Sequence, residues 1–95
     1  MGVHNLMEEI VKTCLKELMH IKPELQSMDE KSQEDVMAIA LNKLPAKYVS
    51  TGVGEVFAKT QLRMQVETDV YRELTNAIDK VRNSKKRTDL EEKNE

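Results

Sequence analysis

Apolar residues recur at helical spacing along most of this chain, and this periodicity limits the fold more than any other feature. Between Val3 and about His20 they occupy positions 3, 6, 7, 10, 11, 14, 15, 18 and 19. Residues at this spacing share one face of an α-helix. Asn5 and Glu8 have the spacing of a capping box, and Pro23 lies just beyond the expected end. The pattern predicts an amphipathic helix that buries one broad face.

A second helix is predicted after the polar, poorly periodic stretch PELQSMDEKSQED, which indicates a loop. Ser32 is the expected N-cap of this helix, because acidic residues follow it where the helix dipole favours them. The helix is expected to run to about Leu44, and Pro45 stops it.

The last helix is expected to begin at about Glu55 or Ala58 and to end at about Asn83. A helix of roughly 25 residues is about 37 Å long, so one end overhangs or packs on a partner. Its expected apolar stripe consists of Val56, Leu62, Val66, Val70, Leu74, Ala77, Ile78 and Val81. Methionines are expected to fill gaps in the core, among them Met7, Met19, Met37 and Met64.

The segment ALNKLPAKYVSTGVGEVFAKT, residues 40–60, interrupts the helical pattern with a proline, two glycines and aromatic residues. Residues 47–57 are predicted to hold a short β segment or turn. An isolated two-stranded hairpin is marginal in water, so a strand here is expected to pair across a dimer or to pack on helices.

The predicted fold is therefore mainly α: a small domain of three to four helices over residues 1–83, followed by a charged, mostly disordered tail over residues 84–95. Aromatic residues make up only 3% of the 95 residues, so the core of one copy is thin. We expect a homodimer to supply further burial.

Charge and composition exclude several classes of function. The net charge is −2, which does not favour a protein that coats nucleic acid, and no apolar run approaches the ~20 residues of a membrane span. No membrane association and no direct nucleic acid contact are expected. The single cysteine, Cys14, excludes a disulfide within the chain and fits a cytoplasmic location.

Residue patterns typical of an enzyme are also missing. The stretch TGVGE lacks the third glycine and the βαβ context of a dinucleotide-binding fingerprint. Cys14 belongs to the apolar stripe and is expected to be an inert buried thiol. His4 and His20 are interpreted as surface residues at the two ends of the first helix. No metal site is expected within one chain, because one cysteine and two histidines stand at no ligand spacing.

The interrupting segment contains the best candidate binding site. Lys47, Tyr48, Thr51, Lys59 and Arg63 combine cations, a hydroxyl and a phenol. Cations meet phosphates and an aromatic ring stacks on a base, so this set suits a phosphorylated, base-bearing ligand. A solvated turn with ordinary surface lysines accounts for the same residues, and spacing alone favours it.

The segments DVMAIALNKLPAKYVSTGVGEVFAK and DVYRELTNAIDKVRN resemble the late competence development protein ComFB family, and VHNLMEEIV resembles the family's opening helix. The resemblance covers about Val3 to Arg82. It implies a mainly helical homodimer without enzymatic activity and a receptor for cyclic dinucleotides, chiefly cyclic di-GMP. It thereby favours a ligand site over a solvated turn.

One departure from the family concerns zinc. Many ComFB-like sequences carry clustered cysteines just before the second helix, whereas this chain has MDEKSQEDV there, with Asp29 and Ser32 in place of thiolates. We therefore expect no zinc at this position and a loop held by caps and packing.

Two functions follow as hypotheses. The first is a dimeric, non-enzymatic cyclic di-GMP receptor in bacterial signalling, whose approximately two-fold ligand suits a symmetric dimer. The alternative is a dimeric helical adaptor linked to competence or motility that binds a protein partner and no nucleotide.

Overall fold

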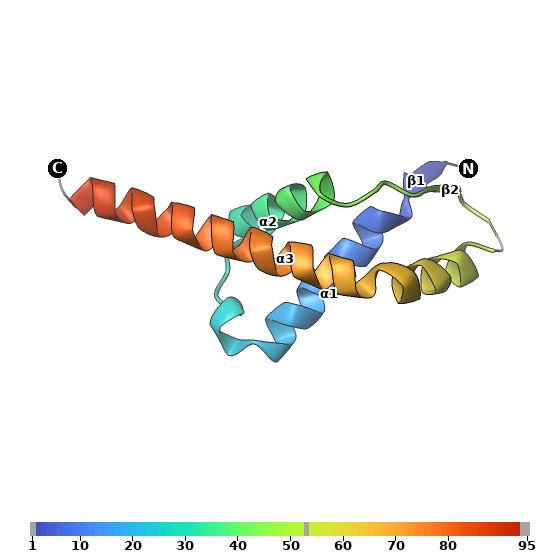
Figure 1. The fold of residues 1–95 in the computed structure, drawn as a ribbon, viewed down its shortest axis with the longest axis horizontal. Coiled ribbons are helices and arrows are strands. Elements are labelled where there is room, and N and C mark those ends of the chain that lie inside the picture. Colours follow the sequence, from blue (N-terminus) through green and yellow to red (C-terminus); the bar gives the residue numbers. More distant parts are fainter. Residues whose placement is uncertain (1, 53, 94–95) are drawn as a thin grey trace.

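The structure, a computed structural model, describes residues 2–52 and 54–93, with side chains described as far as Lys85. Three helices and a two-stranded antiparallel sheet make up the fold (Figure 1). In chain order the elements are β1 (Val3–Asn5), α1 (Leu6–Ile21), the 3-10 turn η1 (Pro23–Leu25), α2 (Glu30–Asn42), β2 (Tyr48–Ser50) and α3 (Glu55–Lys93). The prediction of a mainly helical fold with a short β segment in the middle is confirmed.

Helix α1 has the predicted amphipathic pattern, with its apolar face against α2 and α3. Asn5 is its N-cap, and the Asn5 Oδ1 atom accepts a hydrogen bond from the Met7 amide at 3.1 Å. The expectation that the helix includes Val3 is wrong, because residues 3–5 are extended. Pro23 begins η1, and α1 ends just before it at Ile21.

The extended residues before α1 pair with β2, so the sheet closes within one chain. The register joins Val3 to Ser50, His4 to Val49 and Asn5 to Tyr48. Two bonds reinforce this junction: the Leu6 amide donates to the Lys47 carbonyl at 2.7 Å, and the Lys47 amide donates to Asn5 Oδ1 at 2.8 Å. The strand therefore pairs within the chain and not across a dimer, which was one of the two expected alternatives.

Helix α2 begins three residues earlier than predicted. Its N-cap is Asp29, whose Oδ1 accepts from the Ser32 amide at 2.9 Å, so the assignment of Ser32 as N-cap is wrong. Ser32 is nearly buried, at 8% exposure, inside the first turn. The helix ends at Asn42 and is capped by Lys43, shortly before Pro45.

The core lies where the three helices meet. Cys14 on α1, Val36 and Ala40 on α2, and Val70 and Leu74 on α3 are all without solvent exposure. The remaining buried apolar residues are Leu6, Met7, Ile10, Val11, Leu15, Leu25, Ala77 and Ile78. The interpretation of Cys14 as a buried core residue is confirmed, and burial raises the pKa of its thiol.

Helix α3 is much longer than the rest of the molecule requires. Its 39 residues reach Lys93, so the expected end at Asn83 is wrong, whereas the start at Glu55 is as predicted. The chain measures 57 × 25 × 19 Å. Its radius of gyration is 15.6 Å, against about 12 Å for a compact domain of this length. Both ends of α3 extend past the part packed against α1 and α2 (Figure 1).

The apolar stripe of α3 is buried over only part of its length. Val70, Leu74, Ala77 and Ile78 are in the core, and Leu62, Val66 and Val81 pack against it. Val56 is 76% exposed and Met64 is 78% exposed, so the expectation that both join the core is wrong. The start of α3 thus presents apolar side chains to solvent.

Candidate functional site

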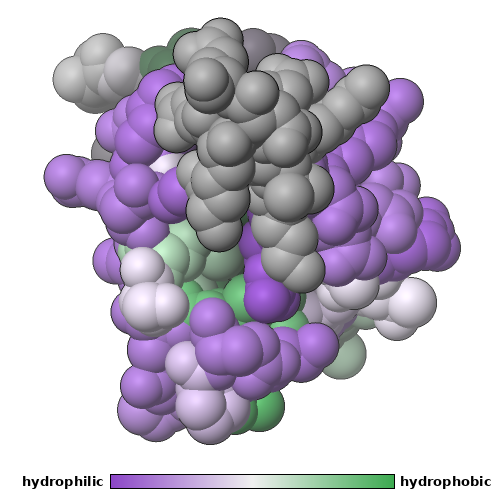
Figure 2. Space-filling model, turned by 90° about the vertical axis from the view of Figure 1, so that its left-hand side faces the viewer, coloured by the Kyte–Doolittle hydropathy of each residue, from purple (hydrophilic) through white to green (hydrophobic). Residues whose placement is uncertain are grey.

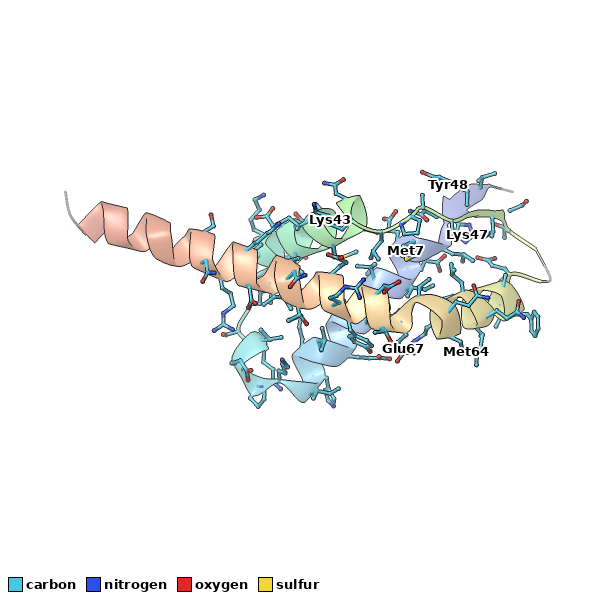
Figure 3. All side chains as sticks on the ribbon, in the orientation of Figure 1. Met7, Lys43, Lys47, Tyr48, Met64 and Glu67 are labelled. Carbon is cyan, nitrogen blue, oxygen red and sulfur yellow. The ribbon has the colours of Figure 1, made fainter. Side chains whose placement is uncertain are left out.

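Three of the predicted ligand residues lie on or beside β2. Tyr48 is 67% exposed, and Lys47 is exposed with no ion pair to its side chain among the described residues. Both lie at the edge of the molecule along β2 (Figure 3). Thr51 is tied to the N-terminus, since its amide and its Oγ1 donate to the Gly2 carbonyl at 3.1 and 3.3 Å. Lys47 and Tyr48 are therefore the members of the predicted site whose side chains are available for a ligand.

The other two predicted residues lie one turn apart on α3 and already have acidic partners. Lys59 Nζ is 3.6 Å from Glu9 Oε1, and the Arg63 guanidinium donates to Glu17 Oε2 at 2.7 Å. A weaker ion pair joins Arg63 to Glu67 at 3.8 Å. These contacts connect α3 to α1, so an anionic ligand would compete with the glutamates for these cations.

Glu17 is the centre of a small polar network between α1 and α3. The Tyr71 hydroxyl donates to Glu17 Oε2 at 2.7 Å, on the same oxygen that Arg63 contacts. These two hydrogen bonds, the one from Tyr71 first, lower the pKa of Glu17. Burial, together with the bond to Glu17, raises the pKa of Tyr71, which therefore stays a donor. The network orients α3 on α1. Arg63, which the sequence predicts as a ligand-binding residue, thus makes a structural contact here.

The structure therefore divides the predicted site into two groups. Tyr48 lies in β2, with Lys47 just before the strand and Thr51 just after it, whereas Lys59 and Arg63 belong to the contact between α3 and α1. No described hydrogen bond or ion pair joins one group to the other. An exposed phenol beside an unpaired ammonium group can stack on a base and bind a phosphate.

Acidic residues and a histidine, none of them predicted as site residues, lie close to both groups. His4 of β1 contacts Glu9 of α1 and Glu55 of α3, and one ligand atom from each lies within 4.8 Å of the others. His4 is therefore a half-buried strand residue and not the surface residue at a helix start that the sequence indicated. Local spacing gives no signal for this cluster, because Glu55 is distant in sequence from the other two.

A hollow of about 650 Å³ between α2 and α3 is a second concave surface, near the start of α2. Its lining mixes cations and anions that are paired with each other: Lys31 is 2.9 Å from Asp35, and Lys85 is 3.5 Å from Asp29. The end of the molecule near the C-terminus is mostly hydrophilic, with a small hydrophobic area in a hollow (Figure 2). Neither feature selects an anionic ligand.

The loop before α2 is held as the sequence indicated, by a helix cap. The Asp29 side chain caps α2 through Ser32, and these bonds, with a smaller contribution from Lys85, lower the pKa of Asp29.

Among the described residues, no helix has both the length and the apolar composition needed to cross a bilayer.

Comparison with known proteins gives one match. Residues 4–85 match the sequence profile of a family described as late competence development protein ComFB. No curated protein and no solved structure shows significant similarity to the chain.

Proposed function

The chain belongs to the late competence development protein ComFB family, and on that basis we propose that it is a non-enzymatic, dimeric receptor for a cyclic dinucleotide, chiefly cyclic di-GMP. The receptor function is the one that the family resemblance implies. The exposure and the ion pairs of the predicted site residues support a choice among them as ligand contacts.

The observation that carries this proposal is the exposure of two consecutive residues where the chain enters β2: Tyr48 is 67% exposed, and Lys47 is exposed with no ion pair to its side chain among the described residues. Stacking of a base on an aromatic side chain contributes about 1–3 kcal/mol. The lysine supplies charge for the adjacent phosphate. Pairing holds the backbone at this point, since Tyr48 lies opposite Asn5 in the register and the Lys47 amide and carbonyl bond to Asn5 and Leu6.

The apolar start of α3 supports the dimer. Val56, Phe57 and Met64 are 76%, 68% and 78% exposed, and Phe57 and Met64 are seven positions apart on one helical face. Exposed apolar clusters of this kind mark interaction surfaces. A symmetric dimer on this face presents Lys47 and Tyr48 twice, which suits a ligand with two bases and two phosphates.

We assign a secondary part in binding to the remaining predicted residues, Thr51, Lys59 and Arg63. A phosphate at Lys59 and Arg63 would compete with Glu9 and Glu17 and exchange places with them. Such an exchange would loosen the contact of α3 with α1, and ligand binding would thereby change the position of α3. A ligand acts in this way only through its different affinities for two states.

Calorimetric titration with cyclic di-GMP, at low and moderate salt, tests the proposal. Lys47→Ala and Tyr48→Ala are each expected to weaken binding at least tenfold, which corresponds to about 1.4 kcal/mol. Lys12→Ala is the matched control, because Lys12 is also exposed and has no ion pair among the described residues. The absence of binding by the unmodified chain, or equal losses in all three variants, would contradict the receptor function. Cyclic di-AMP in a parallel titration determines which nucleotide is preferred.

The exposed apolar start of α3 also favours the alternative, a dimeric adaptor that binds a protein partner linked to competence or motility. Charge reversal at Arg63 is an unsuitable test, since a new acid would replace the cation that now contacts Glu17 at 2.7 Å, and the two acids would repel each other and weaken the fold. The double variant Lys59→Gln, Arg63→Gln removes both positive charges and keeps polar side chains. It should weaken nucleotide binding if the chain is a receptor and leave a protein partner bound if it is an adaptor, whereas Phe57→Asp should release that partner.

A further inference from the structure

The cluster of His4, Glu9 and Glu55 has the composition of a metal site. One imidazole and two carboxylates are ligands that suit Zn²⁺ and neighbouring divalent transition metals. Each ligand comes from a different element, β1, α1 and α3. These elements meet at the end of the molecule where the N-terminus lies (Figure 1).

The distances match those expected around one ion. His4 Nε2 is 3.0 Å from Glu9 Oε2 and is also in contact with Glu55 Oε1, and all three ligand atoms lie within 4.8 Å of one another. Ligands bound to zinc at about 2.0–2.2 Å in a tetrahedral site are roughly 3.4 Å apart. Small rotations of the two glutamate side chains are enough to reach this spacing.

A second observation points into the same cluster. Glu9 Oε2 has almost no solvent exposure and no hydrogen-bond partner among the described residues, although it lies beside His4. One imidazole N–H cannot point at two carboxylate oxygens, so one of them lacks a donor. A buried oxygen without a partner is costly. A cation placed among the three ligand atoms would satisfy this oxygen.

We propose that His4, Glu9 and Glu55 bind a divalent transition metal ion, with Zn²⁺ as the reference case and water in the fourth position. Such an ion would join the sheet, the start of α1 and the start of α3. This proposal does not rest on the nucleotide proposal, although Glu9 also pairs with Lys59, which the nucleotide proposal includes. It also differs from the expectation of no metal site, which rested on the spacing of cysteine and histidine along the chain.

Lys59 places a positive charge beside the proposed metal site. Its Nζ is 3.6 Å from Glu9 Oε1, the carboxylate oxygen that faces away from the cluster. The cation partly neutralises Glu9 and opposes a metal ion. Lys59→Gln is therefore expected to tighten metal binding, a response that a purely structural ion pair would not give.

The test uses the untagged full chain, treated with a chelator and then titrated with Zn²⁺ by calorimetry and with Co²⁺ by visible absorption. The unmodified chain is expected to bind one ion per copy and to give the absorption bands of Co²⁺ coordinated by protein side chains. His4→Ala and Glu55→Gln should each weaken binding at least tenfold. His20→Ala is the matched control, since it removes the other histidine, which is exposed on α1. It should bind as the unmodified chain does.

Three results would overturn the proposal: no Zn²⁺ or Co²⁺ binding by the unmodified chain, unchanged binding in His4→Ala and Glu55→Gln, or an equal loss in His20→Ala. Circular dichroism of each variant shows whether it is folded. If His4→Ala does not fold, Glu55→Gln and Glu9→Gln decide the question, because glutamine keeps the size of the side chain and removes only the charged ligand.

Discussion

The sharpest test of the fold compares the same substitution at two positions of α3. Val70 lies in the three-helix core with no solvent exposure, whereas Val56 near the start of the helix is 76% exposed. Both positions belong to the apolar stripe that the sequence predicted. Val70→Ala and Val56→Ala therefore make the same chemical change on one helix, in two environments that only the tertiary structure distinguishes.

The expected loss of unfolding free energy in Val70→Ala follows from the atoms that the substitution removes. Val70→Ala removes two buried carbon atoms, and the burial of each contributes about 0.8 kcal/mol to stability. The cavity that remains adds about 24 cal/mol per Å³ where the surroundings do not collapse into it. The sum is about 2 kcal/mol of unfolding free energy. For a domain of this size this corresponds to a decrease in melting temperature of roughly 8–16 °C. Val56→Ala is expected to change stability by less than about 0.5 kcal/mol.

Urea denaturation monitored by circular dichroism measures both values, at a protein concentration where sedimentation shows a monomer. In the monomer, the measured unfolding free energy comes from the core of one copy and contains no contribution from a dimer interface on the start of α3. The m-value should stay the same in both variants, because the surface exposed on unfolding hardly changes. If Val56→Ala lowers the unfolding free energy of the monomer as much as Val70→Ala does, the start of α3 is packed within the chain. The assignment of this surface as free is then wrong.

Three further predictions concern single side chains. Asp29→Ala removes the N-cap of α2 and should cost about 1 kcal/mol, or roughly 4–8 °C in a thermal melt, whereas Glu34→Ala on the exposed face of α2 should have almost no effect. The hydrogen bond from Tyr71 and the neighbouring arginine hold the pKa of Glu17 below its ordinary value. Its contribution to stability is thus present at neutral pH and is lost as the pH falls below about 4.3. Urea titrations give the unfolding free energy at neutral and at acidic pH. The difference between these two values should be smaller for Glu17→Gln than for the unmodified chain, and an equal difference would contradict this role. Cys14 is buried and the pKa of its thiol is raised, so a thiol reagent should label it slowly in the native chain and fast in urea; equal rates would place it at the surface.

The three helices could be predicted from the sequence because local signals determine them. The apolar spacing of α1, Asn5 as its cap and the position of Pro23 specify where that helix lies. Val70, Leu74 and Ala77 were likewise identified as core from their spacing alone. These signals depend on neighbours within about two helical turns, and such neighbours are visible in a sequence.

The partners of the candidate site could not be predicted in the same way. Arg63 and Lys59 were chosen as phosphate ligands from their charge, and the structure pairs them with Glu17 and Glu9 of another helix. Which acid meets which cation depends on how α1 crosses α3, and no local pattern encodes that crossing. Tyr48 was identified because an aromatic residue is rare in this chain, and its exposure supports the choice.

The sequence by itself determined that this chain is helical, which face of each helix is apolar, and to which family it belongs. Only the tertiary structure decided that residues 3–5 pair with β2, that Val56 at the start of the α3 stripe is exposed, and that His4 meets Glu9 and Glu55. The physical reason is the range of the interactions. Helix periodicity and capping act between near neighbours, whereas strand pairing, burial and ion pairs depend on segments that come together only after the helices have packed.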